Sequence, residues 1–291
     1  MKNNTTYSKI IAGTMTWGQW GKNFSKPEMA GLIEYCLSQG ITSFDHADIY
    51  GGYSTEEEFG KAFVAFKVDR EEIQLITKCG IQMVDKARST LVKHYNYSKD
   101  YIIWSAEQSL KKLKTDYIDM FLLHRPSALM EPEPIAEAIS ILLETGKIRS
   151  FGVSNFTPSQ IALVETATPV SSNQLEFSLT ANEVMGNGSL DDCLRHKRML
   201  MSWSPLGAYF RKDSAQIKRM QKVMNTLTEK YNASADQLLL AWVLKHPAAA
   251  HPVVGTTSKE RLTASLKAVH IELELQDWFI LLEASNGHEV P

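Results

Sequence analysis

The stretch ITSFDHADIYG, residues 41–51, joins a predicted strand to a loop that contains an acid and a tyrosine. Its apolar start predicts a short buried strand, which ends at Asp45. Tyr50 follows five positions later and directly precedes Gly51 and Gly52. Packing explains an acid at this place poorly, whereas loops on a rigid scaffold often carry functional side chains.

Three later predicted strands also end in polar residues. The runs 73–77, 120–123 and 151–153 are followed by Lys78, by His124, and by Ser154 with Asn155. Side chains from separate strand ends can meet only if the strands are parallel and open at one mouth. A (β/α)₈ barrel meets this condition, because its active site lies at the C-terminal ends of its strands.

The spacing of strand-like runs predicts a barrel that takes up the whole chain. Helical patterns separate most of the eight runs, which lie near Ile10, Thr42, Ile73, Met120, Ser150, Ser172, Leu200 and Pro252. Alternating strands and helices predict a parallel sheet, and a chain of 291 residues suits one barrel. We therefore predict a single α/β domain over residues 1–291.

Local signals predict helix starts and two long connections. Ser25 and Ser258 are expected N-caps, and capping boxes are expected from Thr55 to Glu58, Thr157 to Gln160 and Ser234 to Gln237. Long ordered connections in compact domains tend to be functional. We therefore expect residues 79–99, after the third strand, and residues 209–232, after the seventh, at the mouth.

Composition favours a cytoplasmic protein without nucleic-acid or membrane partners. The net charge is −2, no basic face is evident, and three distant cysteines suggest a reducing compartment. The polar N-terminus lacks the apolar core of a signal peptide, and no apolar run is long enough to span a bilayer. No Rossmann glycine motif, P-loop or zinc spacing occurs.

Six motifs together resemble the aldo-keto reductase superfamily, and most of all its bacterial YdhF-type oxidoreductases. They are FDHADIYG at 44–51, TKCG at 77–80, LLHRP at 122–126, FGVSNF at 151–156, NQLE at 173–176 and WSPLG at 203–207. The resemblance runs from about Ile10 to the end of the chain. It implies an NADP-dependent oxidoreductase that reduces aldehydes or ketones to alcohols with NADPH.

The resemblance implies a catalytic group of four residues. Tyr50 matches the general acid, Lys78 and Asp45 match the pair that tunes it, and His124 matches the residue that orients the carbonyl. The pKa of tyrosine is about 10, and a lysine cation beside it would lower that value. A buried lysine needs a counter-ion, which Asp45 can supply. Taken alone, each of the four residues could have a structural role. His46, which follows Asp45, is expected to have one.

The resemblance also implies a cofactor site. Ser154, Asn155 and Gln174 match contacts to the nicotinamide carboxamide, Trp203 matches the stacking aromatic, and Ser204, Leu206 and Gly207 match pyrophosphate contacts. Thr256 and Arg261 match contacts to the adenosine 2′-phosphate, which favours NADPH over NADH. Ala264 and Ser265 depart from the acid and amide that often contact adenine, which leaves those contacts open.

Aromatic residues in the predicted mouth loops either contact the substrate or pack the loops. These residues are Trp17, Trp20, Tyr53, Tyr209 and Phe210. An aromatic pocket would accept a carbonyl with an apolar body better than a sugar phosphate, although Lys86, Arg88, Lys93 and His94 could add positive charge.

Two other functions stay open: a cofactor-binding, redox-sensing subunit with little turnover, and a lyase or isomerase barrel. A monomer is the default expectation.

Overall fold

Eight parallel strands close into a barrel in the computed structural model, which describes residues 6–66, 68–85, 88 and 90–291. The strands follow each other around the barrel in the order β1-β10-β9-β8-β7-β6-β3-β2. They are β1 Ile11–Gly13, β2 Ser43–Asp45, β3 Gln74–Cys79, β6 Met120–Leu123, β7 Phe151–Ser154, β8 Ser172–Glu176, β9 Met199–Trp203 and β10 His251–Val254. The predicted (β/α)₈ barrel and its eight strands are confirmed.

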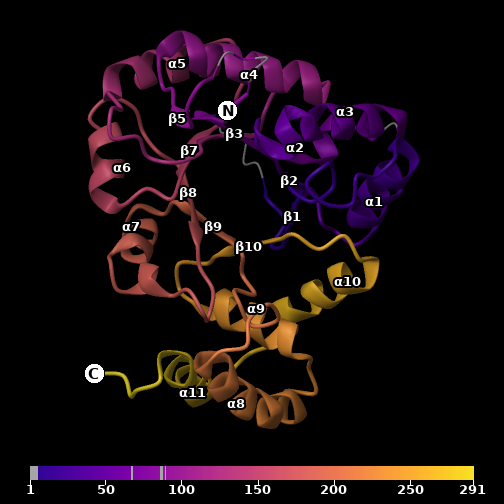
Figure 1. Cartoon of the computed structure of the whole chain (residues 1–291), viewed down its shortest axis with the longest axis vertical. Coiled ribbons are helices and arrows are strands. Elements are labelled where there is room, and N and C mark those ends of the chain that lie inside the picture. The colour runs from indigo at the N-terminus through magenta and orange to yellow at the C-terminus, as the bar shows by residue number, and fades with distance from the viewer. Residues whose placement is uncertain (1–5, 67, 86–87, 89) are drawn as a thin grey trace.

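Helices surround the strands, as Figure 1 shows. The outer helices are α1 Lys26–Ser38, α3 Thr55–Phe66, α4 Lys99–Leu113, α5 Pro132–Glu144, α6 Pro158–Val164, α7 Ser189–His196, α9 Ala235–Lys245 and α10 Lys259–Lys267. The short helix α2, Tyr50–Tyr53, lies in the loop after β2. Within the described chain, no helix is both long enough and apolar enough to cross a bilayer.

Most of the predicted helix starts are confirmed. Capping boxes form at Ser25, Thr157 and Ser234, and the Ser258 hydroxyl accepts a hydrogen bond from the Arg261 amide. The box predicted from Thr55 is wrong. Thr55 is the first residue of α3 and its hydroxyl has no hydrogen-bond partner among the described residues, whereas Ser54 donates its hydroxyl to Glu58.

The two long connections differ in what they contribute to the mouth. Residues 79–99 contain β4, Ile81–Gln82, and β5, His94–Tyr95, an antiparallel pair that contributes Ile81 and Tyr95 to the cleft at the mouth. In 209–232, only Phe210 and Arg211 reach that cleft. The rest is mainly α8, Ala215–Tyr231. The expectation that residues 209–232 lie at the mouth is therefore largely wrong.

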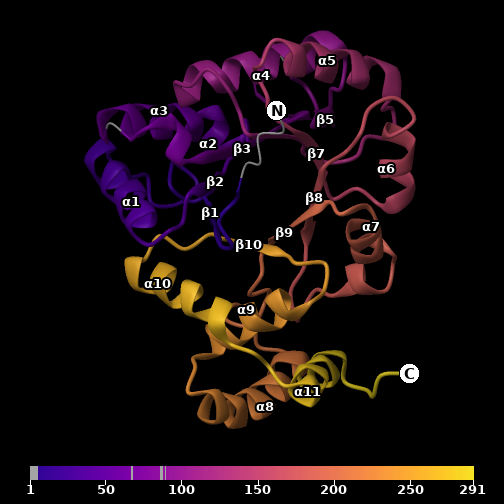
Figure 2. The same ribbon diagram turned by 180° about the vertical axis from the view of Figure 1, so that it is seen from behind.

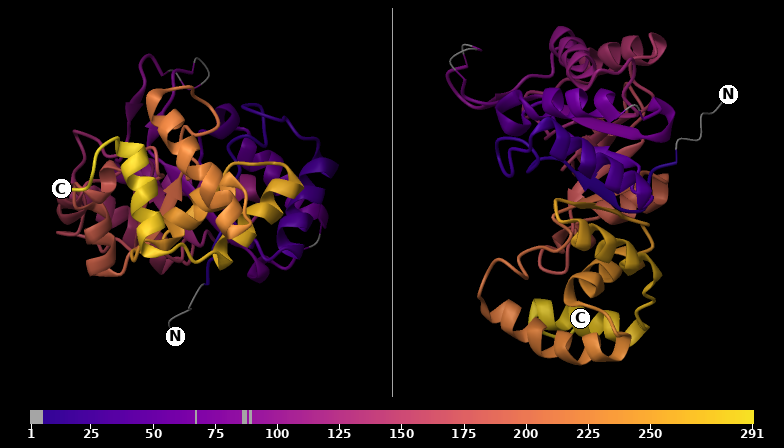
Figure 3. Two further views of the ribbon diagram at one scale, coloured as in Figure 1. Left: turned by 90° about the horizontal axis from the view of Figure 1, so that it is seen from below. Right: turned by 90° about the vertical axis from the view of Figure 1, so that its right-hand side faces the viewer.

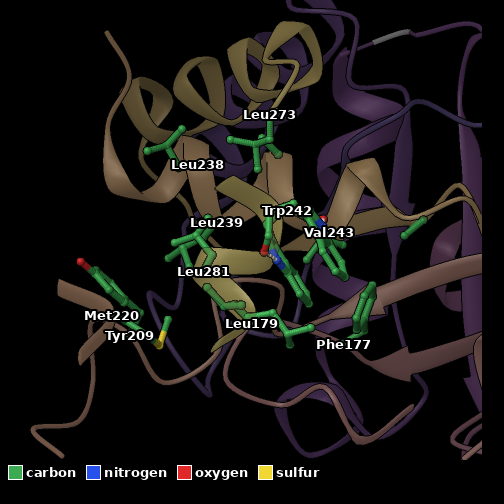
Figure 4. Close-up of a cluster of buried hydrophobic side chains, with 14 of the residues drawn as sticks. Phe177, Leu179, Tyr209, Met220, Leu238, Leu239, Trp242, Val243, Leu273 and Leu281 are labelled. Carbon is green, nitrogen blue, oxygen red and sulfur yellow. Dashed lines mark hydrogen bonds between the residues drawn. The ribbon is translucent and has the colours of Figure 1, made fainter. Parts of the chain in front are cut away.

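Helix α8 packs against α11, Leu275–Asn286, in a layer outside α9 (Figures 1, 2 and 3). Trp242 of α9 and Trp278 of α11 stack with ring centroids 4.8 Å apart and planes within 6°. Each indole N–H donates to the other residue's carbonyl oxygen, over 3.1 and 3.0 Å. Figure 4 shows the buried cluster around Trp242, which includes Tyr209 and Met220.

The barrel interior changes from apolar to polar along the strands. Ile76, Leu122 and Met201 belong to one buried apolar cluster. Residues two positions apart on a strand face the same side, so the next inward positions are Lys78, His124 and Trp203. The apolar cluster therefore closes the barrel behind a polar layer at the C-terminal ends of the strands.

Candidate active site

A buried ion pair lies at the base of the mouth. Lys78 Nζ donates to Oδ1 and Oδ2 of Asp45 over 2.7 and 2.8 Å, and to the His46 carbonyl oxygen over 2.7 Å. The Tyr50 hydroxyl lies 3.4 Å from the same nitrogen. Lys78 is fully buried, whereas Asp45 and Tyr50 line the cleft, so the tyrosine hydroxyl lies between the buried cation and the open space.

The pKa of Tyr50 is set by two opposing effects. Burial raises it above the ordinary value for tyrosine, and the Lys78 cation opposes this shift without cancelling it. The sequence-based expectation of a lowered value is therefore wrong in its net direction. Burial also lowers the pKa of Lys78, but Asp45 and Tyr50 outweigh it and the net shift is upward. At neutral pH the Tyr50 phenol and the Lys78 amine are therefore both protonated.

His124 lines the cleft next to Tyr50, with ring centroids 6.2 Å apart and planes at 76°. Burial, followed by the charges of Lys78, Arg125 and Lys93, holds the pKa of His124 well below its usual range. The imidazole is therefore neutral at physiological pH. Its Nδ1 atom is buried and has no hydrogen-bond partner among the described residues.

A chain of hydrogen bonds joins the polar residues of β7, β8 and β9. Gln174 Nε2 donates to Asp45 Oδ1 over 2.8 Å, Asn155 Nδ2 to Ser154 Oγ over 2.8 Å, and Trp203 Nε1 to Asn155 Oδ1 over 2.9 Å. Asn155 has a φ of 62°, a left-handed conformation that asparagine tolerates well. The Ser154 hydroxyl in turn donates to the Gln174 carbonyl oxygen over 3.1 Å, so these bonds fix the Trp203 ring and the amide groups relative to the ion pair.

The cleft at the mouth has a volume of about 1540 Å³ and holds all nine predicted cofactor residues. Binding pockets for one small molecule usually measure roughly 300–1,000 Å³, so this cleft has room for a dinucleotide and a small substrate together. Asp45, Tyr50 and His124 lie on its wall as well. The predicted cofactor residues and three of the four predicted catalytic residues therefore line one continuous space.

One side of the cleft suits phosphate groups. Gly255, Thr256 and Thr257 line it at the start of α10, together with Arg261. Free N–H groups at a helix N-terminus favour an anion, and guanidinium groups bind phosphate through paired hydrogen bonds. Arg211 adds a second guanidinium, which donates to the Gly207 carbonyl oxygen over 2.6 Å.

This donor set fits a phosphorylated dinucleotide. Arg261, exposed at the rim, makes no side-chain hydrogen bond with the described residues and lies beside Thr256. Gly207 has a φ of 55° and packs against Thr180 and Ser178, which leaves no space for a side chain. Gly207 itself lines the cleft, where its backbone is open to a pyrophosphate. Among the described residues, no cluster of His, Cys, Asp or Glu could hold a metal ion.

Only two of the five predicted substrate aromatics line the cleft. These are Phe210 and Trp20, whose ring lies 6.2 Å from that of Tyr50. Trp17 is 0% exposed and packs against Phe44 and Phe59 in the core, so its predicted role is corrected.

Tyr53 and Tyr209 do not line the cleft either. The Tyr53 ring lies 3.4 Å from the Arg88 guanidinium, and its hydroxyl accepts from the Met83 amide over 3.0 Å. Tyr209 is buried in the cluster of Figure 4. Both are therefore removed from the candidate substrate contacts.

Sequence reasoning missed several charged residues of the cleft. Arg125 directly follows His124, and its guanidinium lies 5.6 Å from the Trp203 ring centroid. Lys22, Arg211, Asp236 and Glu260 also line the cleft, the last two alongside Ala264 and Ser265. Arg125 lies inside the LLHRP motif and could have been found there. Lys93 reaches the cleft as expected, whereas Lys86 lies outside the described residues.

His46 has a structural place, as expected from the sequence. Its Nδ1 lies 2.8 Å from the Thr14 hydroxyl, and its ring meets that of Phe59 edge-on at 4.4 Å. Burial, with the Lys78 charge as the second cause, lowers the pKa of His46 to about 3.

Comparison with known proteins agrees with this geometry. A model of the Aldo/keto reductase family matches residues 9–285. The chain belongs to this family. Oxidoreductase YdhF of Escherichia coli (strain K12) is 36% identical, over 98% of this chain and 96% of that protein. The predicted similarity to YdhF-type members of the aldo/keto reductase family is thus confirmed.

Two further aldo/keto reductase relatives have informative names. A 6-dehydroglucose reductase of Agrobacterium fabrum (strain C58) is 35% identical, and the match covers 97% of each chain. The crystal structure of an aldo/keto reductase from Klebsiella pneumoniae, in complex with NADP and acetate, has a TM-score of 0.79 at 24% identity. That match covers 98% of this chain and 93% of the other, and it supports the fold.

Proposed function

We propose that this protein reduces aldehydes or ketones to alcohols with NADPH, and that Tyr50 donates the proton. The observation that carries the proposal is the Tyr50 hydroxyl between buried Lys78 and the cleft, 3.4 Å from the ammonium. A neutral His124 lines the same wall. Membership of the aldo/keto reductase family supports carbonyl reduction.

Tyr50 acts as the general acid in this proposal. Its raised pKa keeps the phenol protonated before reaction. When the proton leaves for the carbonyl oxygen, the phenolate faces the Lys78 ammonium, which stabilises the negative charge in a buried setting. Asp45 holds Lys78 in position through both carboxylate oxygens, so the cation needs no reorganisation during the reaction.

His124 orients the carbonyl in this proposal. We assign its proton to Nε2, because a buried N–H without a partner at Nδ1 would be costly. The Nε2–H group can then donate a hydrogen bond to the carbonyl oxygen, which gains negative charge in the transition state. A neutral histidine also adds no third positive charge beside Lys78 and Arg125.

The chain would hold NADPH along the cleft. Thr256 and Arg261 would bind the 2′-phosphate, the loop 204–211 the pyrophosphate, and the β7–β9 network the nicotinamide. Gln174 Oε1 accepts no hydrogen bond from the described residues, which leaves it free for the carboxamide. When bound, the nicotinamide supplies the hydride that these side chains cannot. The Trp203 indole, fixed by Asn155, would cover one face of its ring.

The proposal can be tested with NADPH deuterated at C4 of the nicotinamide. The purified protein is mixed with a panel of aldehydes and ketones, and NADPH absorbance and the alcohol product are followed. We expect deuterium on the carbinol carbon when one of the two C4 isotopomers is used. NADPH binding without oxidation by any carbonyl would contradict the proposal and favour a cofactor-sensing subunit.

A further inference from the structure

Two cations beside the catalytic histidine have no anionic partner among the residues that the structure describes. Arg125 and Lys93 both line the cleft. No described residue forms an ion pair or a side-chain hydrogen bond with either, and the only described contact of the Arg125 guanidinium is with the Trp203 ring. Asp45, an anion on the nearby wall, is already bound by Lys78 and Gln174.

Both cations lie near the reacting groups. Their charges lower the pKa of His124, and the charge of Arg125 also opposes the rise in the pKa of Tyr50. Arg125 follows His124 directly, so their Cα atoms are about 3.8 Å apart. Lys93 reaches the same wall from the connection before β5.

The cofactor phosphates have other cations available. Arg261 lies beside Thr256 at the start of α10, and Arg211 is bonded to Gly207 in the loop after β9. Arg125 and Lys93 come from the loops after β6 and β4, elements on which no predicted phosphate contact lies. They are therefore surplus to the binding of the cofactor.

The cleft also has an apolar wall, part of which lies beside Tyr50. Trp20, Ile49, Ile81 and Phe210 line it, with Tyr95 from the strand that follows Lys93. Such a wall favours a substrate with a hydrocarbon or aromatic body. A guanidinium and an ammonium near this wall add affinity for a negative charge on that body.

We infer that the preferred substrates are carbonyl compounds with an anionic group, a carboxylate or a phosphate, held by Arg125 and Lys93. This inference rests on the proposed reductase function and names its substrate class. It also revises the expectation that the mouth favours a carbonyl with an apolar body over a sugar phosphate. The guanidinium would bind two oxygens of the anion while His124 and Tyr50 hold the carbonyl oxygen.

The test uses substrate pairs that differ in charge. 4-Carboxybenzaldehyde is compared with 4-carbamoylbenzaldehyde, the two 3-substituted isomers are compared likewise, and glyceraldehyde 3-phosphate is compared with glyceraldehyde. Wild type, Arg125→Gln and Lys93→Gln are measured with NADPH. Arg195→Gln is the matched control, because Arg195 is exposed on α7 and does not line the cleft.

We expect wild type to favour the charged member of at least one pair by about 10- to 100-fold in kcat/KM, the scale of a hydrogen bond to a charged group. The preference should arise mainly from KM and should fall about tenfold or more in Arg125→Gln, and less in Lys93→Gln. Arg195→Gln should keep it. Preference for the benzaldehyde acids alone identifies carboxylates, and preference for the triose phosphate alone identifies phosphate esters.

Equal kcat/KM values within every pair, or a preference that survives in both cleft variants, would overturn the inference while leaving the reductase function intact. Calorimetric titration of benzoate and benzamide, in the presence of NADP⁺, tests binding separately from turnover. Tighter binding of benzoate that is lost in Arg125→Gln supports the anion site even if no carbonyl is reduced. In that case the proposed reductase function would be wrong, whereas the anion site would stand.

Discussion

Lys78 Nζ lies 2.7 and 2.8 Å from the two carboxylate oxygens of Asp45, at the C-terminal ends of adjacent strands β3 and β2. Both side chains are buried, so neither charge is stabilised by bulk water. Desolvation of such a pair is costly unless every donor is satisfied. The bond from Lys78 to the His46 carbonyl and the bond from Gln174 to Asp45 complete this arrangement.

Replacing Asp45 should therefore lower the stability of the fold. Asp45→Asn leaves the Lys78 ammonium buried without a counter-charge, and we expect it to lower the free energy of unfolding by about 3–5 kcal/mol. Urea denaturation measures this loss. The control is Glu57→Gln, which breaks the exposed Lys61–Glu57 pair and should cost at most about 1 kcal/mol. Equal effects of the two changes would contradict the account of the buried pair.

Variants of Trp17 and Trp20 should distinguish a residue that packs in the core from one that contacts the substrate. Trp17 is 0% exposed, so Trp17→Ala should lower stability by about 3–5 kcal/mol. Trp20 is 42% exposed and lines the cleft, so Trp20→Ala should change KM for apolar carbonyls and leave the melting temperature nearly unchanged. Thermal denaturation and steady-state kinetics on both variants check this contrast. A large loss of stability in Trp20→Ala would argue against it.

Acid should destabilise the fold through its buried histidines. The lowered pKa values of His46 and His124 keep both rings neutral in the folded protein, whereas in the unfolded chain they bind protons below a pH of about 6.5. The unfolded state then holds more protons, so stability falls as the pH drops below that value. Each histidine contributes up to about 1.4 kcal/mol per pH unit.

The contribution of His46 can be measured from the slope of unfolding free energy against pH. His46→Gln should reduce this slope between about pH 6 and 4. His288→Gln, at an exposed position near the C-terminus, is the control and should leave the slope unchanged. A slope that is the same in all three proteins would mean that His46 is not held neutral by the fold.

Arg261 should distinguish the two nicotinamide cofactors. Loss of a hydrogen bond to a charged phosphate predicts that Arg261→Ala weakens NADPH binding by about 1–3 kcal/mol and hardly changes NADH binding. Quenching of tryptophan fluorescence gives both dissociation constants without turnover. Arg195→Ala serves as the control for loss of a surface charge. An equal loss for both cofactors would refute the assignment of Arg261 to the 2′-phosphate.

The strands and the residues at their ends could be predicted because both depend on local pattern. Asp45, Lys78 and His124 each directly follow or end an apolar run, and parallel strands bring such ends together. The direction in which a loop side chain points has no comparable pattern in the sequence. Trp17 turns back onto Phe44 and Phe59, whereas Trp20, three residues later, faces Tyr50.

Other errors arose where one element changes the role of its neighbour. Because α3 begins at Thr55 directly after α2, the hydroxyl that bonds to Glu58 is that of Ser54, and nothing in the run of residues 50–58 distinguishes the two hydroxyls. The net pKa shift of Tyr50 depends on how completely the fold removes water, which sequence spacing does not report. That Arg125 has no anionic partner in the described part of the chain likewise depends on how several loops meet.

The central claim is that Tyr50 supplies the proton, and the most direct measurement compares wild type with Tyr50→Phe in single-turnover oxidation of NADPH by an aldehyde. The variant keeps the aromatic ring and removes only the hydroxyl. We expect oxidation to be abolished while the dissociation constant for NADPH stays near that of wild type. Turnover at the wild-type rate in Tyr50→Phe would show that the proton comes from another group and would contradict the mechanism.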